Sequence, residues 1–139
     1  MIFPEWMKRL GKVYRKHGRA IFIDMPLPGV VKAMESIKDR GIHAMSGISG
    51  YDSGNGMLLF YHFVHAGVVL TLRVRLPEGR PLAPSVAGIF PSAMLFEQEN
   101  HEMLGIAFKG NKSMGPVLLS GDSPRTPLKK KGERNAKGE

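Results

Sequence analysis

An alternation of apolar and polar side chains over residues 70–76 constrains the fold of this chain more than any other feature. The apolar positions are Leu70, Leu72, Val74 and Leu76, and the polar positions between them are Thr71, Arg73 and Arg75. Successive side chains of a strand point to opposite faces of a sheet, so the pattern predicts a strand with one buried face. A second apolar run at residues 57–64 ends before His65-Ala66-Gly67, which predicts a hairpin whose second arm is residues 68–76.

The segments on either side of the hairpin add further strands and helices. Residues 20–24 are apolar and lead into a proline-containing turn, as expected of a buried strand. Residues 30–40 have helical periodicity, residues 42–51 are expected to be extended, and residues 91–104 are expected to form a last helix. Together these elements predict an α+β fold with a largely antiparallel four-stranded sheet and helices packed on one face.

The first 19 residues have the pattern of one basic amphipathic helix. Its apolar positions are Phe3, Trp6, Met7, Leu10, Val13 and Tyr14, and its basic positions are Lys8, Arg9, Lys12, Arg15 and Lys16. Gly18 is a plausible end for the helix. Three roles stay open for it: packing on its own domain, packing on a neighbouring protein, and attachment to a membrane surface through its basic and aromatic side chains.

The net charge of +8 belongs to the two ends of the chain. Residues 1–19 contribute +5, residues 122–139 contribute +3, and the segment between them is neutral. Basic ends on a neutral body favour acidic partners, membrane headgroups or nucleic acid, although solubility alone also explains them. Residues 111–139 are expected to form an extended basic tail that is either disordered or ordered by a partner, after a folded domain at residues 1–110.

The composition excludes several kinds of site. The chain has no cysteine, which excludes disulfides, cysteine-ligated iron–sulfur clusters and the usual structural zinc sites on this chain. No apolar run approaches the roughly 20 residues needed to span a bilayer, and no secretory signal is expected. Glycines are frequent at residues 47–56, but the Lys-Ser/Thr of a phosphate-binding loop does not follow them.

The carboxylates of the last helix do not have the spacing of a catalytic pair. Glu97 and Glu99 are two residues apart and point to different sides of a helix, whereas Glu99 and Glu102 share a flank. Glu97 and His101 are four apart, but two ligands fall short of the roughly four that a closed metal site needs. We therefore expect no catalytic residue, no metal and no bound cofactor on this chain, and an acidic helix edge that meets Arg or Lys of a partner.

Residues 90–110 contain the most specific pattern of the chain. In order, the pattern consists of Pro91, Ala93, Glu97, Glu99, Glu102, Met103, Leu104, Gly105, Ile106, Phe108 and Gly110. It resembles the signature of the 30 kDa subunit of complex I and of its relatives in membrane-bound, energy-converting NiFe hydrogenases. Pro127-Leu128-Lys129-Lys130 is similar to a tail element of that family. Gln98, Asn111-Lys112 and Thr126 depart from the family pattern, which leaves open the complex to which the chain belongs.

The resemblance implies a cofactor-free structural subunit in the peripheral arm of a membrane-bound, hydrogenase-like redox complex, on the cytoplasmic side of the membrane. Its implied partners are a large catalytic subunit, a small iron–sulfur subunit and membrane-arm subunits, with the NiFe centre and the iron–sulfur clusters in those partners and electron transfer coupled to ion translocation. The implied contact residues are Glu97, Glu99, Glu102, Met103, Gly105, Lys109, Pro127, Leu128, Lys129 and Lys130.

Two alternatives remain. The first is the same structural role in an NADH/quinone or related complex I-type oxidoreductase. The second is a small nucleic-acid-binding domain, which the sequence pI of about 10 favours. The neutral body and the expected lack of an aromatic row beside Arg73 and Arg75 speak against this second role, so no nucleic-acid partner is expected.

Overall fold

The computed structural model describes residues 2–111 of the 139-residue chain. Five strands form one sheet in the order β1-β2-β5-β4-β3. Their bounds are β1 Lys12–His17, β2 Ala20–Met25, β3 Gly47–Asp52, β4 Met57–His65 and β5 Val68–Arg75. All neighbouring strands are antiparallel except β2 and β5, which run parallel. The α+β class and the largely antiparallel sheet are confirmed, with five strands where four were expected.

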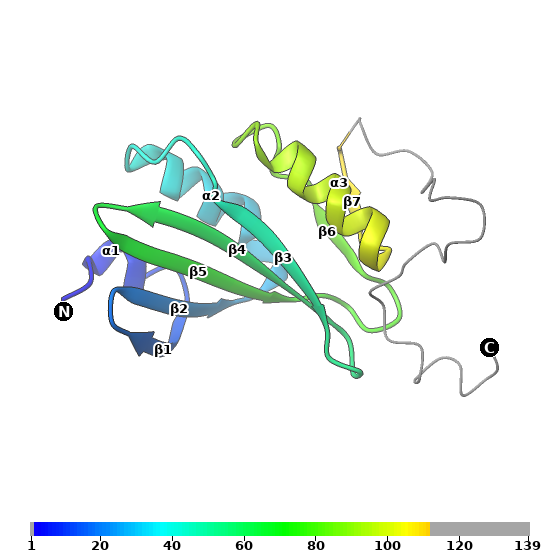
Figure 1. The fold of residues 1–139 in the computed structure, drawn as a ribbon, viewed down its shortest axis with the longest axis horizontal. Coiled ribbons are helices and arrows are strands. Elements are labelled where there is room, and N and C mark those ends of the chain that lie inside the picture. The colour runs from blue at the N-terminus through cyan, green and yellow to red at the C-terminus, as the bar shows by residue number, and fades with distance from the viewer. Residues whose placement is uncertain (1, 112–139) are drawn as a thin grey trace.

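The helices and a small second sheet complete the described part of the chain. The helices are α1 (Glu5–Lys8), the 3-10 turn η1 (Leu27–Gly29), α2 (Val30–Asp39) and α3 (Ala93–Leu104). Strands β6 (Leu82–Pro84) and β7 (Ala107–Lys109) pair in parallel as a two-stranded sheet beside α3. Helices α2 and α3 lie on the same side of the five-stranded sheet, with α2 nearer to α1 and α3 farther from it (Figure 1).

The prediction of one helix over residues 1–19 is wrong beyond its first turn. Helix α1 ends at Lys8, and Lys12–His17 form strand β1, which pairs antiparallel with β2. Gly11 lies where a Cβ atom would meet the backbone carbonyl of Asp24 and lie 2.9 Å from the Ile23 Cγ2 atom. Residues 12–17 therefore pair with the edge of β2 as a strand. The backbone hydrogen bonds of this pairing outweigh the weak helical preference of so short a segment.

The core lies between the sheet and the helices. Alternate side chains of β2, β4 and β5 point toward α2 and α3 and are fully buried. They are Ile21, Ile23, Leu59, Tyr61, Phe63, Leu70, Leu72 and Val74. The ring of Phe63 packs on Phe90, just before α3, with the ring centroids 5.2 Å apart. The alternation that the sequence predicted for residues 70–76 is thus confirmed, since it supplies the core face of the central strand β5.

The other face of the sheet corrects one expectation. By strand register, the face that bears Arg73 and Arg75 also bears aromatic side chains. By register they are Phe22, Tyr51 and Phe60, and Tyr14 joins them through its contacts with Arg73 and Phe22. The Arg73 guanidinium lies 3.9 Å from the Tyr14 ring centroid and donates to Asp24 at 3.0 Å, and Arg15 lies 5.9 Å from the Phe22 ring. The chain's own arginines therefore occupy two of these rings.

His62 lies near the middle of this outer face and is held on both sides. Its Nε2 atom is 3.1 Å from the Ser49 hydroxyl and its Nδ1 atom is 3.0 Å from the Thr71 hydroxyl. Burial lowers the pKa of His62 below its ordinary value of 6.5. The folded protein therefore binds a proton at this position less readily than the unfolded chain does.

This difference predicts a pH dependence of stability. Below the ordinary pKa of 6.5, His62 becomes protonated in the unfolded chain but stays neutral in the folded protein. Protonation then stabilises only the unfolded state, so the free energy of unfolding should fall on acidification. The fall should stop below the lowered pKa of the folded state. Urea unfolding at several pH values between about 5 and 8 measures it. His62→Gln should flatten this part of the profile, and an unchanged profile would contradict the assignment.

Candidate protein interface on helix α3

Helix α3 partly reverses the pattern of an ordinary surface helix: it buries two polar side chains beside two apolar ones and leaves three large apolar side chains exposed. The side chains that face the sheet are Ala93, Glu97, Asn100 and Leu104. On the outer side Met94, Leu95 and Met103 are 42%, 58% and 37% exposed. Both polar residues of the inner face have specific partners, so the reversal is built into the fold.

Glu97 is fully buried and joins three segments of the chain. Its Oε1 atom accepts hydrogen bonds from the Ser85 hydroxyl at 2.7 Å and from the Asn111 side-chain amide at 2.8 Å. Its Oε2 atom accepts one from the backbone N–H of Val86 at 2.8 Å. Ser85 and Val86 follow β6, and Asn111 follows β7, so a single carboxylate ties α3 to the ends of both strands of the small sheet.

Asn100 anchors the same helix to the large sheet. Its side-chain amide donates to the backbone carbonyl of Ile48 in β3 and to that of Phe96, both at 2.9 Å. A Cβ atom added to Gly50 would lie 2.8 Å from the Asn100 Oδ1 atom and would meet the Leu104 side chain. Glycine at this position of β3 therefore lets α3 approach the strand closely.

The C-terminal end of α3 follows the sequence prediction. Gly105 adopts the left-handed conformation with φ of 74°, and its N–H donates to the His101 carbonyl at 2.9 Å. The His101 Nδ1 atom lies 2.9 Å from the Ile106 carbonyl oxygen. The chain then turns into β7, so Gly105 has a backbone role here.

The outer side of α3 is the candidate interface, which we call the α3 face. Its side chains are Met94, Leu95, Gln98, Glu99, Glu102 and Met103. Next to it lies a shallow hollow of about 390 Å³, lined by Pro91, Ser92, Met94, Leu95, Phe96 and Gln98. The α3 face thus combines apolar side chains with two carboxylates and a concave region.

The predicted contact residues do not all lie on this face. Glu97 is a correction: it is buried behind the helix and bound within the chain, so it cannot belong to an exposed acidic edge. Glu99 and Met103 are exposed and Glu102 is half-buried on the α3 face. Lys109 is exposed on β7, a different element. Residues 127–130 lie outside the described residues.

Sequence reasoning missed Met94 and Leu95. Helical spacing of the apolar residues groups Phe96, Met103 and Leu104 on one side and makes Asn100 a polar interruption, whereas Asn100 lies at the centre of the buried side. The buried residues Ala93, Glu97, Asn100 and Leu104 do follow the helical spacing of three and four residues, but two of them are polar. That signal is visible only when polar residues are allowed in the core.

Among residues 2–111, no group of three or more His, Asp or Glu side chains is placed to hold a metal ion. No helix in that range is long and apolar enough to cross a membrane. The α3 face itself presents exposed methionine and leucine beside carboxylates, a combination suited to contact with another protein.

Comparison with known proteins identifies relatives of the chain. A family model described as "Respiratory-chain NADH dehydrogenase, 30 Kd subunit" matches residues 23–137. NAD(P)H-quinone oxidoreductase subunit J of Synechococcus sp. (strain CC9902) is 36% identical over 121 residues, which cover 75% of this chain and 61% of the relative. Membrane-bound hydrogenase subunit beta of Pyrococcus furiosus is 37% identical over 70 residues, which cover 50% of this chain and 40% of the relative.

The chain thus spans less than two thirds of the length of these relatives. A solved structure of the membrane-bound sulfane sulfur reductase, an archaeal respiratory membrane complex, contains a chain with a similar fold. The TM-score is 0.75 at 22% sequence identity, over 87% of this chain and 76% of that chain.

Proposed function

The chain belongs to the family of the 30 kDa subunit of respiratory-chain NADH dehydrogenase, and from this membership we propose that it is a cofactor-free structural subunit of a membrane-bound redox complex. It binds the large catalytic subunit and the small iron–sulfur subunit in the cytoplasmic peripheral arm and holds them in register. The catalytic centre and the iron–sulfur clusters belong to those partners. Electron transfer in the complex is coupled to ion translocation.

The observation that carries this proposal is the α3 face. Exposed methionine and leucine side chains are unfavourable in water, and burying one of them fully contributes about 1.5–3 kcal/mol. Meanwhile Glu97 and Asn100 fix the helix from behind through hydrogen bonds to three other segments. A rigid helix with an apolar outer side suits a permanent protein contact, because little conformational entropy is lost when the partner binds.

The carboxylates of the α3 face set the register of that contact. Glu99 and Glu102 flank the apolar side chains, where Arg or Lys of the large subunit can pair with them. Charges at an interface edge favour the correct orientation and suppress wrong partners more than they add affinity. Met103 contributes apolar contact area between them.

We favour a complex of the NiFe-hydrogenase type, and an NADH/quinone or related complex I-type oxidoreductase is the second candidate. The quinone oxidoreductase subunit J and the membrane-bound hydrogenase subunit beta each share more than a third of their aligned residues with this chain. Membrane-arm subunits would complete either complex. Affinity purification of the tagged chain from its native membranes in mild detergent, followed by mass spectrometry, identifies the large subunit that accompanies it.

Reversing both carboxylates tests the interface. In the variant Glu99→Lys with Glu102→Lys we expect about tenfold less large subunit to co-purify, which corresponds to about 1.4 kcal/mol. Like charges then oppose the basic side chains of the partner. The charge-matched control is Glu35→Lys with Glu78→Lys, two exposed positions away from α3 that should leave co-purification unchanged.

Thermal unfolding of both variants shows whether the domain stays folded. Normal recovery of the large subunit with the Glu99/Glu102 variant would overturn the assignment of the α3 face. Equal loss with the control variant would do the same, since it would mean that net charge and not this surface governs assembly.

A further inference from the structure

We propose that a basic groove between the N-terminal segment and α2 binds an acidic, partly apolar segment of a partner protein. Helix α1, which contributes Trp6 to one wall of the groove, lies at the end of the molecule opposite α3 (Figure 1). The groove is thus a second surface, independent of the function proposed for the α3 face.

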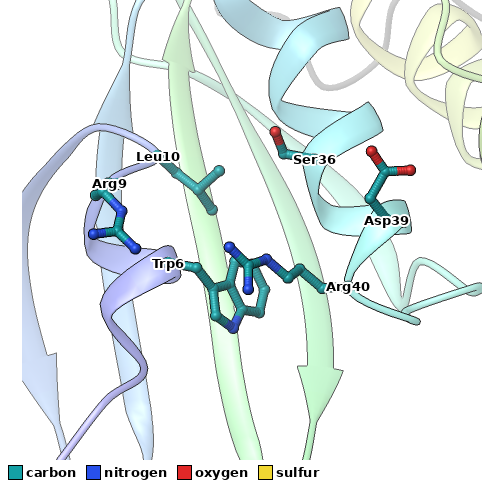
Figure 2. Close-up of a pocket in the computed structure, with 6 residues that line it drawn as sticks. All are labelled: Trp6, Arg9, Leu10, Ser36, Asp39 and Arg40. Carbon is teal, nitrogen blue, oxygen red and sulfur yellow. The ribbon is translucent and has the colours of Figure 1, made fainter.

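Three adjacent hollows make up the groove, which we call the basic groove. The first, of about 300 Å³, lies where α1 meets the end of α2 (Figure 2). The second, of about 270 Å³, shares Arg9, Leu10 and Ser36 with the first. The third, of about 420 Å³, shares Met25 and Pro26 with the second. The shared lining residues place the three hollows next to one another.

Cations from several elements line the basic groove. They are Arg9, Lys12, Lys32, Arg40 and Arg75. The acidic lining residues are Asp24 and Asp39. Asp24 is already paired with Arg73, which donates to it at 3.0 Å. Asp39 points away from the Arg40 guanidinium in Figure 2. The groove therefore has an excess of positive charge along its whole length, which attracts an acidic ligand.

Apolar side chains line the same groove between the cations. They are Trp6, Leu10, Met25, Pro26 and Ala33. Mixed cationic and apolar lining fits a peptide whose carboxylates alternate with aliphatic side chains. A phosphodiester backbone would satisfy the cations but would leave the apolar lining without partners.

The contacts of the Trp6 indole favour an acidic peptide over nucleic acid or a membrane surface as the ligand of the groove. The Arg40 guanidinium lies 5.5 Å from the Trp6 ring centroid, and Figure 2 shows it across the ring. The rings of His65 and Trp6 lie in an edge-to-face arrangement, with the centroids 6.4 Å apart. Arg40 therefore already covers one face of the Trp6 indole, while the rest of the side chain lines the groove. Base stacking and insertion into a membrane interface both need a free aromatic face.

The test measures binding of a short fluorescein-labelled peptide of alternating Glu and Leu to the full-length chain by fluorescence anisotropy. The comparison probes are the matching Gln–Leu peptide, a labelled single-stranded oligonucleotide and vesicles of phosphatidylserine with phosphatidylcholine. We expect the Glu–Leu peptide to bind and to stay bound at physiological salt, and the Gln–Leu peptide to bind at least about tenfold more weakly.

Two variants localise the binding. Arg9→Gln with Arg40→Gln should weaken Glu–Leu binding about tenfold. Lys38→Gln with Arg80→Gln removes the same charge at exposed positions that do not line the groove, and it should change binding less than about twofold. Ser36→Glu adds a carboxylate in the stretch that two hollows share and should weaken binding without removing a cation.

Three results would overturn the proposal. One is equal weakening by the groove pair and the control pair, which would reduce the effect to net charge. Another is tighter binding of the oligonucleotide or the vesicles than of the Glu–Leu peptide. The third is equal binding of the Glu–Leu and Gln–Leu peptides. Because α3 is unchanged in all these variants, the outcome is separate from that of the Glu99 and Glu102 experiment.

Discussion

Replacing Glu97 by alanine is expected to lower the free energy of unfolding by about 3–5 kcal/mol, although an acidic residue on a helix would ordinarily be replaceable. Hydrogen bonds to a charged acceptor contribute about 1.5–3 kcal/mol each, and Glu97 accepts three of them while fully buried. Truncation removes all three and leaves the Val86 N–H and the Asn111 amide without this acceptor.

The substitution also creates a cavity between α3 and the small sheet. We expect the connection after β6 and the segment after β7 to loosen together, because Glu97 joins both to the helix. Urea unfolding followed by circular dichroism measures the loss. Glu97→Gln should lower the free energy of unfolding less than Glu97→Ala does, because the amide keeps one acceptor oxygen. Some loss should remain, because the amide presents an N–H group where the carboxylate accepted a hydrogen bond.

Glu99→Ala is the matched control, because it removes an exposed carboxylate from the same helix. Its effect should stay within about 0.5 kcal/mol. The two variants thus separate the structural carboxylate from the interface carboxylate. Equal stability of the Glu97 and Glu99 variants would mean that the buried carboxylate does not anchor α3.

Adding a methyl group at Gly50 should have the next largest effect, a loss of about 1–3 kcal/mol for Gly50→Ala. The new Cβ atom would lie 2.8 Å from the Asn100 Oδ1 atom, 3.3 Å from the Ile106 Cδ1 atom and in contact with the Leu104 side chain. Asn100 cannot move away without weakening its hydrogen bonds to Ile48 and Phe96. The helix must therefore shift away from β3.

Gly47→Ala on the same strand is the control. A Cβ atom there would have its nearest neighbour, His62 Cδ2, at 4.0 Å, an ordinary contact. Alanine should be neutral or stabilising by up to about 1 kcal/mol at that position, because glycine weakens a strand interior. Thermal unfolding of the two variants makes the comparison. If Gly50→Ala were as stable as Gly47→Ala, the close approach of α3 to β3 would not matter for stability.

The strands were predictable where side chains alternate. Residues 57–64 and 68–76 were expected as a hairpin, and the structure has β4 and β5 there within one residue at each end. The turn between them has Ala66 and Gly67 at φ of 52° and 78°. Two left-handed residues match the right-handed twist of the strands, so a tight two-residue turn forms.

Segment 12–17 shows where periodicity misleads. Its apolar and basic residues fit a helix in isolation, but a hairpin with β2 satisfies the backbone of both segments. Within residues 12–17 themselves nothing distinguishes the two conformations, because the deciding partner, residues 20–25, is a strand in either case. Gly11, just before this segment, argues against a continuous helix, because helices disfavour glycine. The structure shows why glycine stands there: residue 11 approaches the backbone of β2 closely.

The sequence by itself determined the α+β class and the buried face of β5, because these depend on local periodicity. It also determined the end of α3 at Gly105, through the backbone conformation of glycine, and the family, through the order of side chains at positions 90–110. Tertiary structure alone decided which of three similar glutamates belongs to the core. Glu97 is buried because residues 85, 86 and 111 bring hydrogen-bond donors to it from beyond the helix, whereas Glu99 faces outward. A carboxylate can be buried only where the fold supplies such donors, and the residue itself does not reveal them.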